Sequence, residues 1–370
     1  MKYLTTLQGF PDSLLSEIMN AQEEMDWLRR ASAQDLVDLA ATQLGVERVP
    51  DMPQDLTARQ LGNLRTPELL DLLEPFYLEG TSTARDLADQ IQICRAFSNP
   101  EEVTDHVASL VEKKVREFPK KALDLKVGKN RGDVLDPYIL AANFELLSER
   151  SLSKTIEHTA SHKVLMKIED MAGHLHEETL SRMRGNFRVP EPNGKEGKEE
   201  LHPFYNPFPG ADVGQVPLEE SPDKLRLFQV KSKTGSAKGG DGKRLGLQLK
   251  KIEDTYKADT FYVAVVGNTL IGHRSKGAVL KASPNTAVLV GEASLNELTQ
   301  SNSGAELLLR LYQRAFRVAA KRTGYKFSEL VLGMIASFET EAEEQGADFL
   351  TAWLHNATDG PRREQDSRLQ

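Results

Sequence analysis

Cysteine is almost absent from this sequence, with Cys94 the single one among 370 residues. One cysteine cannot form an intramolecular disulfide or a cysteine-based zinc site, so both are excluded. Apolar runs are also short, far below the roughly 20 residues that a membrane-spanning helix needs. The N-terminus has no continuous apolar segment of the kind that signal peptides contain. We therefore expect a soluble, cytoplasmic protein with no membrane association.

Aromatic residues are few, at 6%, whereas hydrophobic residues make up 39% of the chain and charged residues 28%. This balance is typical of a globular protein and excludes a disordered or fibrous one. At roughly 150 residues per domain, a chain of this length suggests two to three domains.

The net charge of -8 is distributed unevenly. Residues 1–100 hold 16 Asp and Glu against 8 Lys and Arg, whereas the remaining residues carry 39 of each sign. Within that neutral part, residues 223–257 contain ten Lys and Arg against four Asp and Glu, a local charge of +6. Screening over about 8–10 Å makes local charge matter more than net charge, so this segment can bind a polyanion; a solvated charged surface is the alternative.

Apolar spacing and capping residues predict an all-helical N-terminal region. Helices are expected to begin near Asp12, Ser32 and Thr66, and two more to cover 83–97 and 100–118. A second helical block is expected from 137 to 184, with a core-facing stripe at three-four spacing. Its members are Leu165, Ile168, Ala172, Leu175, Thr179 and Met183.

Residues 185–222 are rich in proline and glycine and predict a long, irregular loop. Strand signals follow at 225–232, 260–266, 269–274 and 287–290, with helices over 245–256 and 303–322. A strand, a helix and a buried strand in succession indicate an α/β (α+β) fold with a mixed sheet. The three expected parts are a helical region over 1–130, the sheet-containing core over 131–330, and C-terminal helices with a polar tail over 331–370.

Three polar residues are spaced as a strand-based site requires. Gln229 and Lys231 are two apart in the predicted strand, so both point to the same face. Asp212 precedes Gln229 by 17 positions and is expected on an adjacent strand after a hairpin connection. A carboxylate, an amide oxygen and an ammonium group at one point suit a hard cation such as Mg²⁺. We predict that Asp212 and Gln229 hold Mg²⁺ and that Lys231 positions the attacking water.

This arrangement resembles the PD-(D/E)XK nuclease superfamily, which includes most Type II restriction endonucleases and the Mrr-like nucleases. Asp212 matches the first motif position, and Gln229-Val230-Lys231 matches the second in its glutamine variant, where the commoner pattern has Asp or Glu. The resemblance covers residues 150–300. It implies a supporting acid on the preceding helix, for which Glu169 fits and Glu177 is the rival. A second Asp-x-Lys triplet, at 124–126, has no strand acid before it.

The function implied by the resemblance is Mg²⁺-dependent hydrolysis of phosphodiester bonds in double-stranded DNA, leaving a 5′-phosphate and a 3′-hydroxyl. A Type II restriction enzyme is the first expectation, and a Mrr-like nuclease that reads modified DNA is the second. A DNA-binding or scaffold protein with a degenerate nuclease core is the alternative from another class. Because the chain has one set of these residues and a duplex has two strands, we expect a homodimer.

Beyond the motif, the glycine-rich and basic segment is expected to contact DNA phosphates. The candidate DNA-binding residues are Lys233, Lys238, Lys243, Arg244, Gln248, Lys251 and Arg274. No phosphate-binding loop of the Walker type is present in the sequence.

Histidines and aromatics offer weaker signals. His158 and His162 are four apart on a predicted helix and could hold zinc, but no third ligand is apparent. His273 could reach base edges from a surface hairpin. The segment 202–209 is aromatic and proline-rich, and it either packs on the core or shapes a DNA groove. Cys94 is expected to be buried.

Overall fold

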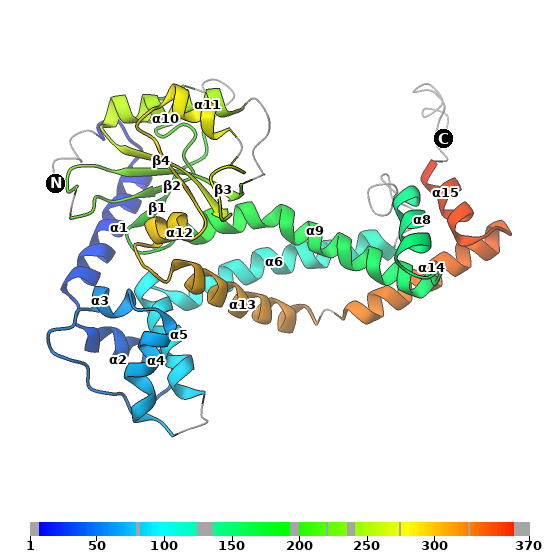
Figure 1. Cartoon of the computed structure of the whole chain (residues 1–370), viewed down its shortest axis with the longest axis horizontal. Helices are drawn as coiled ribbons and strands as arrows, with labels where there is room; N and C mark the ends of the chain where they lie inside the picture. Colours follow the sequence, from blue (N-terminus) through cyan, green and yellow to red (C-terminus); the bar gives the residue numbers. More distant parts are fainter. Residues whose placement is uncertain are drawn as a thin grey trace. The chain divides into compact units, whose positions relative to one another are not determined.

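The computed structural model (Figure 1) describes residues 7–78, 82–123, 136–192, 200–219, 221–234, 241–273, 275–324 and 326–358. The chain forms two compact units, Met1–Val107 with Ala172–Ala315, and Ala108–Met171 with Phe316–Gln370. Each unit combines two separate stretches of sequence, whereas the sequence analysis expected three consecutive parts. The reason is that α6 (Pro100–Leu123), α9 (Leu152–Leu180) and α13 (Gly304–Thr323) each continue across the division.

Short helices form the N-terminal part of the first unit, as the sequence predicts. They are α1 (Asp12–Arg30), α2 (Ala33–Leu44), α3 (Ala58–Gly62), α4 (Thr66–Leu73), the 3-10 turn η2 (Glu74–Phe76) and α5 (Thr83–Ala96). Ser32 caps α2, because its hydroxyl accepts from the Asp35 N–H at 3.1 Å and the Asp35 carboxylate accepts from the Ser32 N–H at 2.8 Å. Gly45 ends the helix with a φ of 68°.

One mixed sheet lies in the same unit. Its strands are β1 (Asn186–Arg188), β2 (Val213–Gln215), β3 (Arg226–Lys233), β4 (Asp259–Val266) and β5 (Ala287–Val290), hydrogen-bonded in that order. The pairs β1–β2 and β2–β3 are antiparallel, and β3–β4 and β4–β5 are parallel. The expected combination of helices with a mixed sheet is therefore confirmed.

Helices cover both faces of this sheet (Figure 1). On one face lie α10 (Asp241–Tyr256) and α11 (Lys276–Ala282). The two helices pack closely because residue 246 is a glycine, and a Cβ at this position would have no room beside Val279. On the other face lies α12 (Glu292–Thr299), whose Glu297 pairs with the buried Arg226 of β3. Successive side chains of β3 point to opposite faces of the sheet. Those of Gln229 and Lys231 point to the face that α10 covers.

A single apolar core joins the N-terminal helices to the sheet. It contains Leu36 and Leu87 from the helices together with Phe187, Leu227 and Tyr262 from the strands. The helical N-terminal region and the sheet therefore share their hydrophobic interior, and the apolar face of α10 completes it through Leu249 and Ile252.

Two predictions about local structure are wrong. The segment 185–222 contains β1 and β2, but three-residue strands are too short to show a period of two. The described part of 269–274 is not a strand: it turns, with the His273 N–H donating to the Leu270 carbonyl at 3.3 Å. His273 is 4% exposed and stacks on Tyr262 at a ring distance of 4.2 Å, so it does not reach out from a surface hairpin.

The second unit is helical in its described part. It contains α8 (Pro137–Leu146), the first part of α9, α14 (Phe327–Gln345) and α15 (Phe349–Thr358) around a small core with Trp353 and Phe338. The stripe predicted on α9 is buried only near its end: Leu165 is 63% exposed, whereas Leu175 is 2% exposed. Among the helices described in either unit, none is long and apolar enough to cross a membrane.

Candidate functional site

Asp212, Gln229 and Lys231 line one pocket of about 570 Å³ in the first unit. Gln229 and Lys231 reach it from β3, where their separation of two residues places both on the α10 face. Asp212 comes from the residue directly before β2, the strand that pairs with β3. The sequence analysis expected these three side chains to converge, with Asp212 on the adjacent strand; the structure has Asp212 one residue before that strand.

The short length of β2 determines where the Asp212 carboxylate lies. Pairing between β2 and β3 starts at Val213 opposite Phe228, so the next residues of β3 extend beyond the end of β2. The backbone N–H of Asp212 donates to the Phe228 carbonyl at 2.8 Å. The Asp212 Oδ2 atom then accepts from the Val230 N–H at 2.7 Å and from the Gln229 side-chain amide. The carboxylate thus satisfies a backbone donor that the short strand leaves unpaired.

Gly210 allows the chain to turn into this position. Its φ is +81°, in the left-handed region that glycine adopts at little cost. A Cβ there would also lie 2.8 Å from the Gln248 Oε1 atom and 3.1 Å from Leu245 Cδ1 on α10. The backbone conformation therefore favours glycine two residues before Asp212, and a larger residue would also displace the Gln248 side chain.

The acid that α9 supplies to the pocket is Glu177, not Glu169. Glu177 lies three residues before the end of α9, next to the turn that leads into β1, and it lines the pocket. Glu169 is exposed and belongs to the second unit, eleven residues before the helix end. The sequence analysis preferred Glu169, whereas the structure places its rival Glu177 in the pocket with Asp212.

Glu178, the neighbour of Glu177, faces a different set of partners. Successive helix residues point about 100° apart. Glu178 is 3% exposed and pairs with Arg188 at 2.5 Å and Arg182 at 2.6 Å, while its carboxylate lies 3.0 Å from the His106 ring. Arg188, which lines the pocket, is thus already paired with a carboxylate that does not line it.

The electrostatics of the pocket disfavour negative charge. Burial raises the pKa of Asp212 to about 7, the like charge of Glu177 acts in the same direction, and Lys231 and the Val230 N–H oppose both. Burial also raises the pKa of Glu177, against the nearby charge of Lys231. Asp212 and Glu177 are half-buried. Two such carboxylates near the Lys231 ammonium group leave an excess of negative charge once both ionise, which a bound cation would offset.

Helix α10 presents a polar face to the pocket. Arg244 and Gln248, one turn apart, both line it, and Lys251 continues the same face at the following turn but is exposed. Lys243 is exposed, while Gln248 is 7% exposed, so Gln248 belongs to the pocket wall rather than to an outer DNA-binding surface. Within the described residues, the buried Gln248 Oε1 atom has no hydrogen-bond partner.

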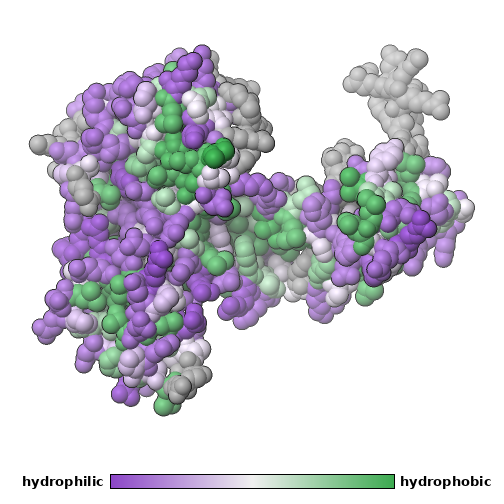
Figure 2. Space-filling view, in the orientation of Figure 1, coloured by the Kyte–Doolittle hydropathy of each residue, from purple (hydrophilic) through white to green (hydrophobic). Residues whose placement is uncertain are grey.

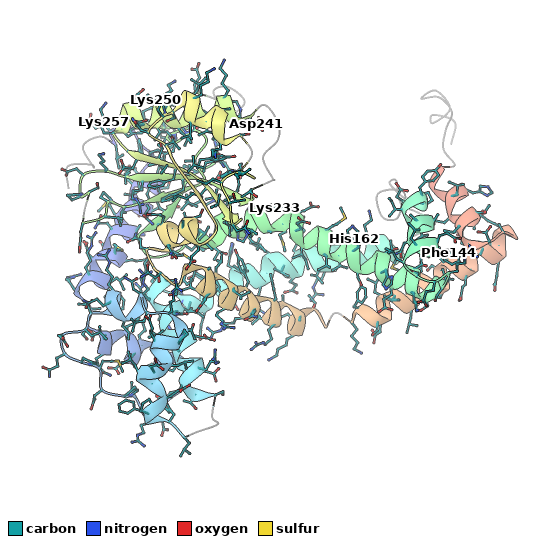
Figure 3. All side chains as sticks on the ribbon, in the orientation of Figure 1. Phe144, His162, Lys233, Asp241, Lys250 and Lys257 are labelled. Carbon is teal, nitrogen blue, oxygen red and sulfur yellow. The ribbon has the colours of Figure 1, made fainter. Side chains whose placement is uncertain are left out.

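Lysines of the basic segment 223–257 lie toward both ends of α10 (Figure 3). Lys233, exposed at the end of β3, lies toward the same end of the unit as Asp241, the first residue of α10. Lys250 and Lys257 lie toward the other end of the helix. Lys238 and Arg274 are outside the described residues, as is the Asp-x-Lys triplet at 124–126.

The pocket residues that sequence reasoning missed include Arg188, Asn206 and Tyr262. Tyr262 sits opposite Gln229 in the parallel β3–β4 register, so it could have been found only after the pairing was known. Arg188 arrives through β1, a strand too short to predict. Asn206 belongs to the aromatic segment 202–209, whose proline content indicated a rigid loop but not its position.

The oxygen atoms available in the pocket suit a hard cation. Asp212 and Glu177 offer carboxylates, and Gln229 offers an amide oxygen if its amide group is turned. Nowhere in the described residues do three His, Cys, Asp or Glu side chains gather into a metal site, so a cation here would need the glutamine. The residues present thus fit Mg²⁺ with a weaker donor set than three carboxylates would supply.

The paired histidines of α9 and the single cysteine do not line this pocket. His158 Nδ1 lies 3.2 Å from the Ser148 hydroxyl, and neither it nor His162 joins a metal-binding cluster in the described residues. Cys94 is buried as expected, and burial raises the pKa of its thiol to about 11, which makes it a poor nucleophile.

A scan against models of known protein families finds no match, and a search of curated proteins finds no relative.

Proposed function

We propose that this chain is a Mg²⁺-dependent nuclease that hydrolyses phosphodiester bonds of double-stranded DNA. The observation that carries the proposal is the convergence of Asp212, Gln229, Lys231 and Glu177 in one pocket. The acid precedes a short strand, the Gln-x-Lys pair lies on the strand beside it, and a further acid ends the preceding helix. A polar pocket with convergent charged groups of altered pKa is the usual form of a catalytic site.

Each residue has a distinct task in this proposal. Asp212, Glu177 and the Gln229 carbonyl would hold Mg²⁺, which when bound polarises the phosphate and lowers the pKa of water. The Lys231 ammonium group donates hydrogen bonds, so it orients the attacking water and offsets charge that develops on the phosphate. Water adds to phosphorus as the bond to the 3′ oxygen breaks, which leaves a 5′-phosphate and a 3′-hydroxyl.

The substrate assignment follows from charge. Arg244 borders the pocket, and Lys243 and Lys251 are exposed on the same helix, so a phosphate backbone could lie along α10. We propose a Type II restriction endonuclease, acting as a homodimer because one pocket of this kind cuts one strand. A nuclease that reads modified DNA is the variant of this proposal that the glutamine favours.

A second candidate is a DNA-binding protein without catalytic activity. The observation that favours it is the side-chain amide of Gln229, which donates to Asp212 and so satisfies the carboxylate through the protein itself. With this bond retained, the pocket would hold Asp212 without a cation.

Incubation of supercoiled plasmid with the purified chain, with and without Mg²⁺, separates the two candidates. We expect nicked and linear products only with Mg²⁺. Binding of the plasmid without any cleavage over a range of Mg²⁺ concentrations and pH values would favour the second candidate. A parallel plasmid carrying methylated bases distinguishes a restriction enzyme, blocked by the modification, from a modification-dependent nuclease, activated by it.

A further inference from the structure

Two aromatic side chains of the segment 202–209, which contributes to the pocket wall, are exposed. Phe204 and Tyr205 are 50% and 51% exposed, although the same segment buries Phe208 to 1% exposure. The two exposed rings lie 5.1 Å apart in an edge-to-face arrangement. Single exposed aromatics are common on protein surfaces, but two adjacent rings on one supported loop form a continuous apolar surface.

The loop that carries these rings is held firmly by its own backbone. His202 and Asn206 exchange two backbone hydrogen bonds, at 3.0 and 2.9 Å. The His202 Nδ1 atom accepts from the backbone N–H groups of Phe204 and Tyr205, at 3.2 and 3.3 Å, and its ring lies 4.7 Å from the Tyr205 ring. A loop fixed in this way loses little conformational entropy when a ligand binds to it.

The residues that follow these two rings in the sequence fix the position of the loop. Phe208 packs edge-on against Phe10 and Tyr256 in the core, at ring distances of 5.3 and 5.4 Å. Asn206 and Phe208 themselves line the candidate catalytic pocket. Tyr205 and Phe204 are therefore one and two residues from a residue that forms the pocket wall.

We propose that Phe204 and Tyr205 form a stacking surface for an unpaired DNA base next to the phosphate that enters the pocket. This inference rests on the nuclease proposed above and specifies its substrate. Bases within a duplex are already stacked and paired, so an aromatic ring can stack only on a base in a single strand, at an end or turned out of the helix. The bound DNA therefore has one unpaired nucleotide beside the cleaved bond, either present beforehand or turned out of the duplex on binding.

Binding of oligonucleotides that carry 2-aminopurine tests this proposal without requiring cleavage. The measurement uses the full chain with Ca²⁺ in place of Mg²⁺ and compares a single-stranded oligonucleotide, a duplex with a one-nucleotide gap and a fully paired duplex. We expect the aminopurine in the unpaired position to change fluorescence on binding. Replacing both rings, Phe204→Ala with Tyr205→Ala, should weaken binding of the unpaired substrates about 5- to 150-fold per lost stacking contact.

Control variants separate stacking from folding. Tyr205→Phe keeps the ring and should bind as the wild type does, whereas Phe204→Leu keeps apolar bulk without an aromatic face and should lose the fluorescence change. Phe76, 42% exposed on η2 and absent from the pocket lining, supplies the matched control Phe76→Ala. It should leave both binding and fluorescence unchanged, and unaltered thermal unfolding of each variant shows that the fold is retained.

Three results would overturn the proposal in distinguishable ways. Unchanged binding and fluorescence in the double variant, with cleavage intact, would refute the stacking surface while leaving the nuclease standing. Equal losses for paired and unpaired DNA would mean that the loop contacts the backbone and not a base. No binding of any DNA by the wild-type chain would refute both the stacking surface and the proposed function.

Discussion

Replacing Asp212 by asparagine should abolish cleavage and, at pH 8, stabilise the metal-free protein. Asparagine keeps an oxygen that can accept from the Val230 N–H, where the Asp212 carboxylate now accepts at 2.7 Å. It removes a charge that burial and Glu177 both disfavour, as the pKa of about 7 for Asp212 indicates. The variant therefore loses the proposed cation ligand and a source of electrostatic strain at the same time.

The size and sign of the effect follow from that pKa. The ordinary value is 3.8, so between about pH 4 and pH 7 the folded protein holds a proton on Asp212 that the unfolded chain has lost. The stability of the wild type consequently falls as the pH rises through this window, by up to about 1.4 kcal/mol per pH unit. The full window gives an upper bound of about 4 kcal/mol, and we expect about 1–3 kcal/mol because Lys231 loses a partner in the variant.

Urea unfolding at pH 5 and pH 8 measures this difference. The chain has two tryptophans, Trp27 in the first unit and Trp353 in the second, so a Trp353→Phe background lets Trp27 report on the unit that holds the pocket. Asp212→Asn should raise the unfolding free energy clearly more at pH 8 than at pH 5, and Asp223→Asn, at an exposed carboxylate, should not. The same gain at both pH values would refute the reasoning that Asp212 is held in a charge-disfavouring site.

Three further predictions concern the neighbours of Asp212. Glu177→Gln should reduce cleavage at least about 100-fold, whereas Glu169→Gln should leave it near the wild-type rate; the opposite order in a plasmid assay would return the supporting acid to Glu169. Gln229→Glu should lower the Mg²⁺ concentration for half-maximal activity, since a third carboxylate joins the site; an unchanged metal titration would remove Gln229 from the ligands. Replacing Lys243 and Arg244 by alanine should flatten the log–log salt dependence of DNA binding by about one to two units, and an unaltered slope would show that neither contacts phosphate.

The sequence predicted that Asp212, Gln229 and Lys231 come together, but it did not locate the short strands β1 and β2 beside them. Gln229 and Lys231 could be placed on one face because strand periodicity is local and exact in sequence. Asp212 could be placed beside them because a hairpin connection pairs the preceding strand with β3 in antiparallel order. The choice between Glu169 and Glu177 could not be made, because it depends on where α9 meets the sheet, which is a property of tertiary packing.

The short strands and the division of each unit into two stretches of sequence were not predicted, because they too are properties of tertiary packing. The strands β1 and β2 have three residues each, so their pairing with β3 and not their own pattern defines them. The glycine at position 210 and the aromatic segment 202–209 look like loop residues in sequence. Their contribution to the pocket appears only when α10 and the core are folded against them.

Cleavage by Lys231→Ala is the measurement that tests the central proposal most directly. With Mg²⁺ and supercoiled plasmid, the variant should cut at least about 100-fold more slowly than the wild type while binding the same DNA with nearly unchanged affinity. Lys257→Ala, at an exposed lysine directly after the far end of α10 (Figure 3), should cut at the wild-type rate. On the face shown in Figure 2, hydrophilic residues cover more of the first unit than hydrophobic ones. Full cleavage by Lys231→Ala would contradict the assignment of this pocket as a nuclease site.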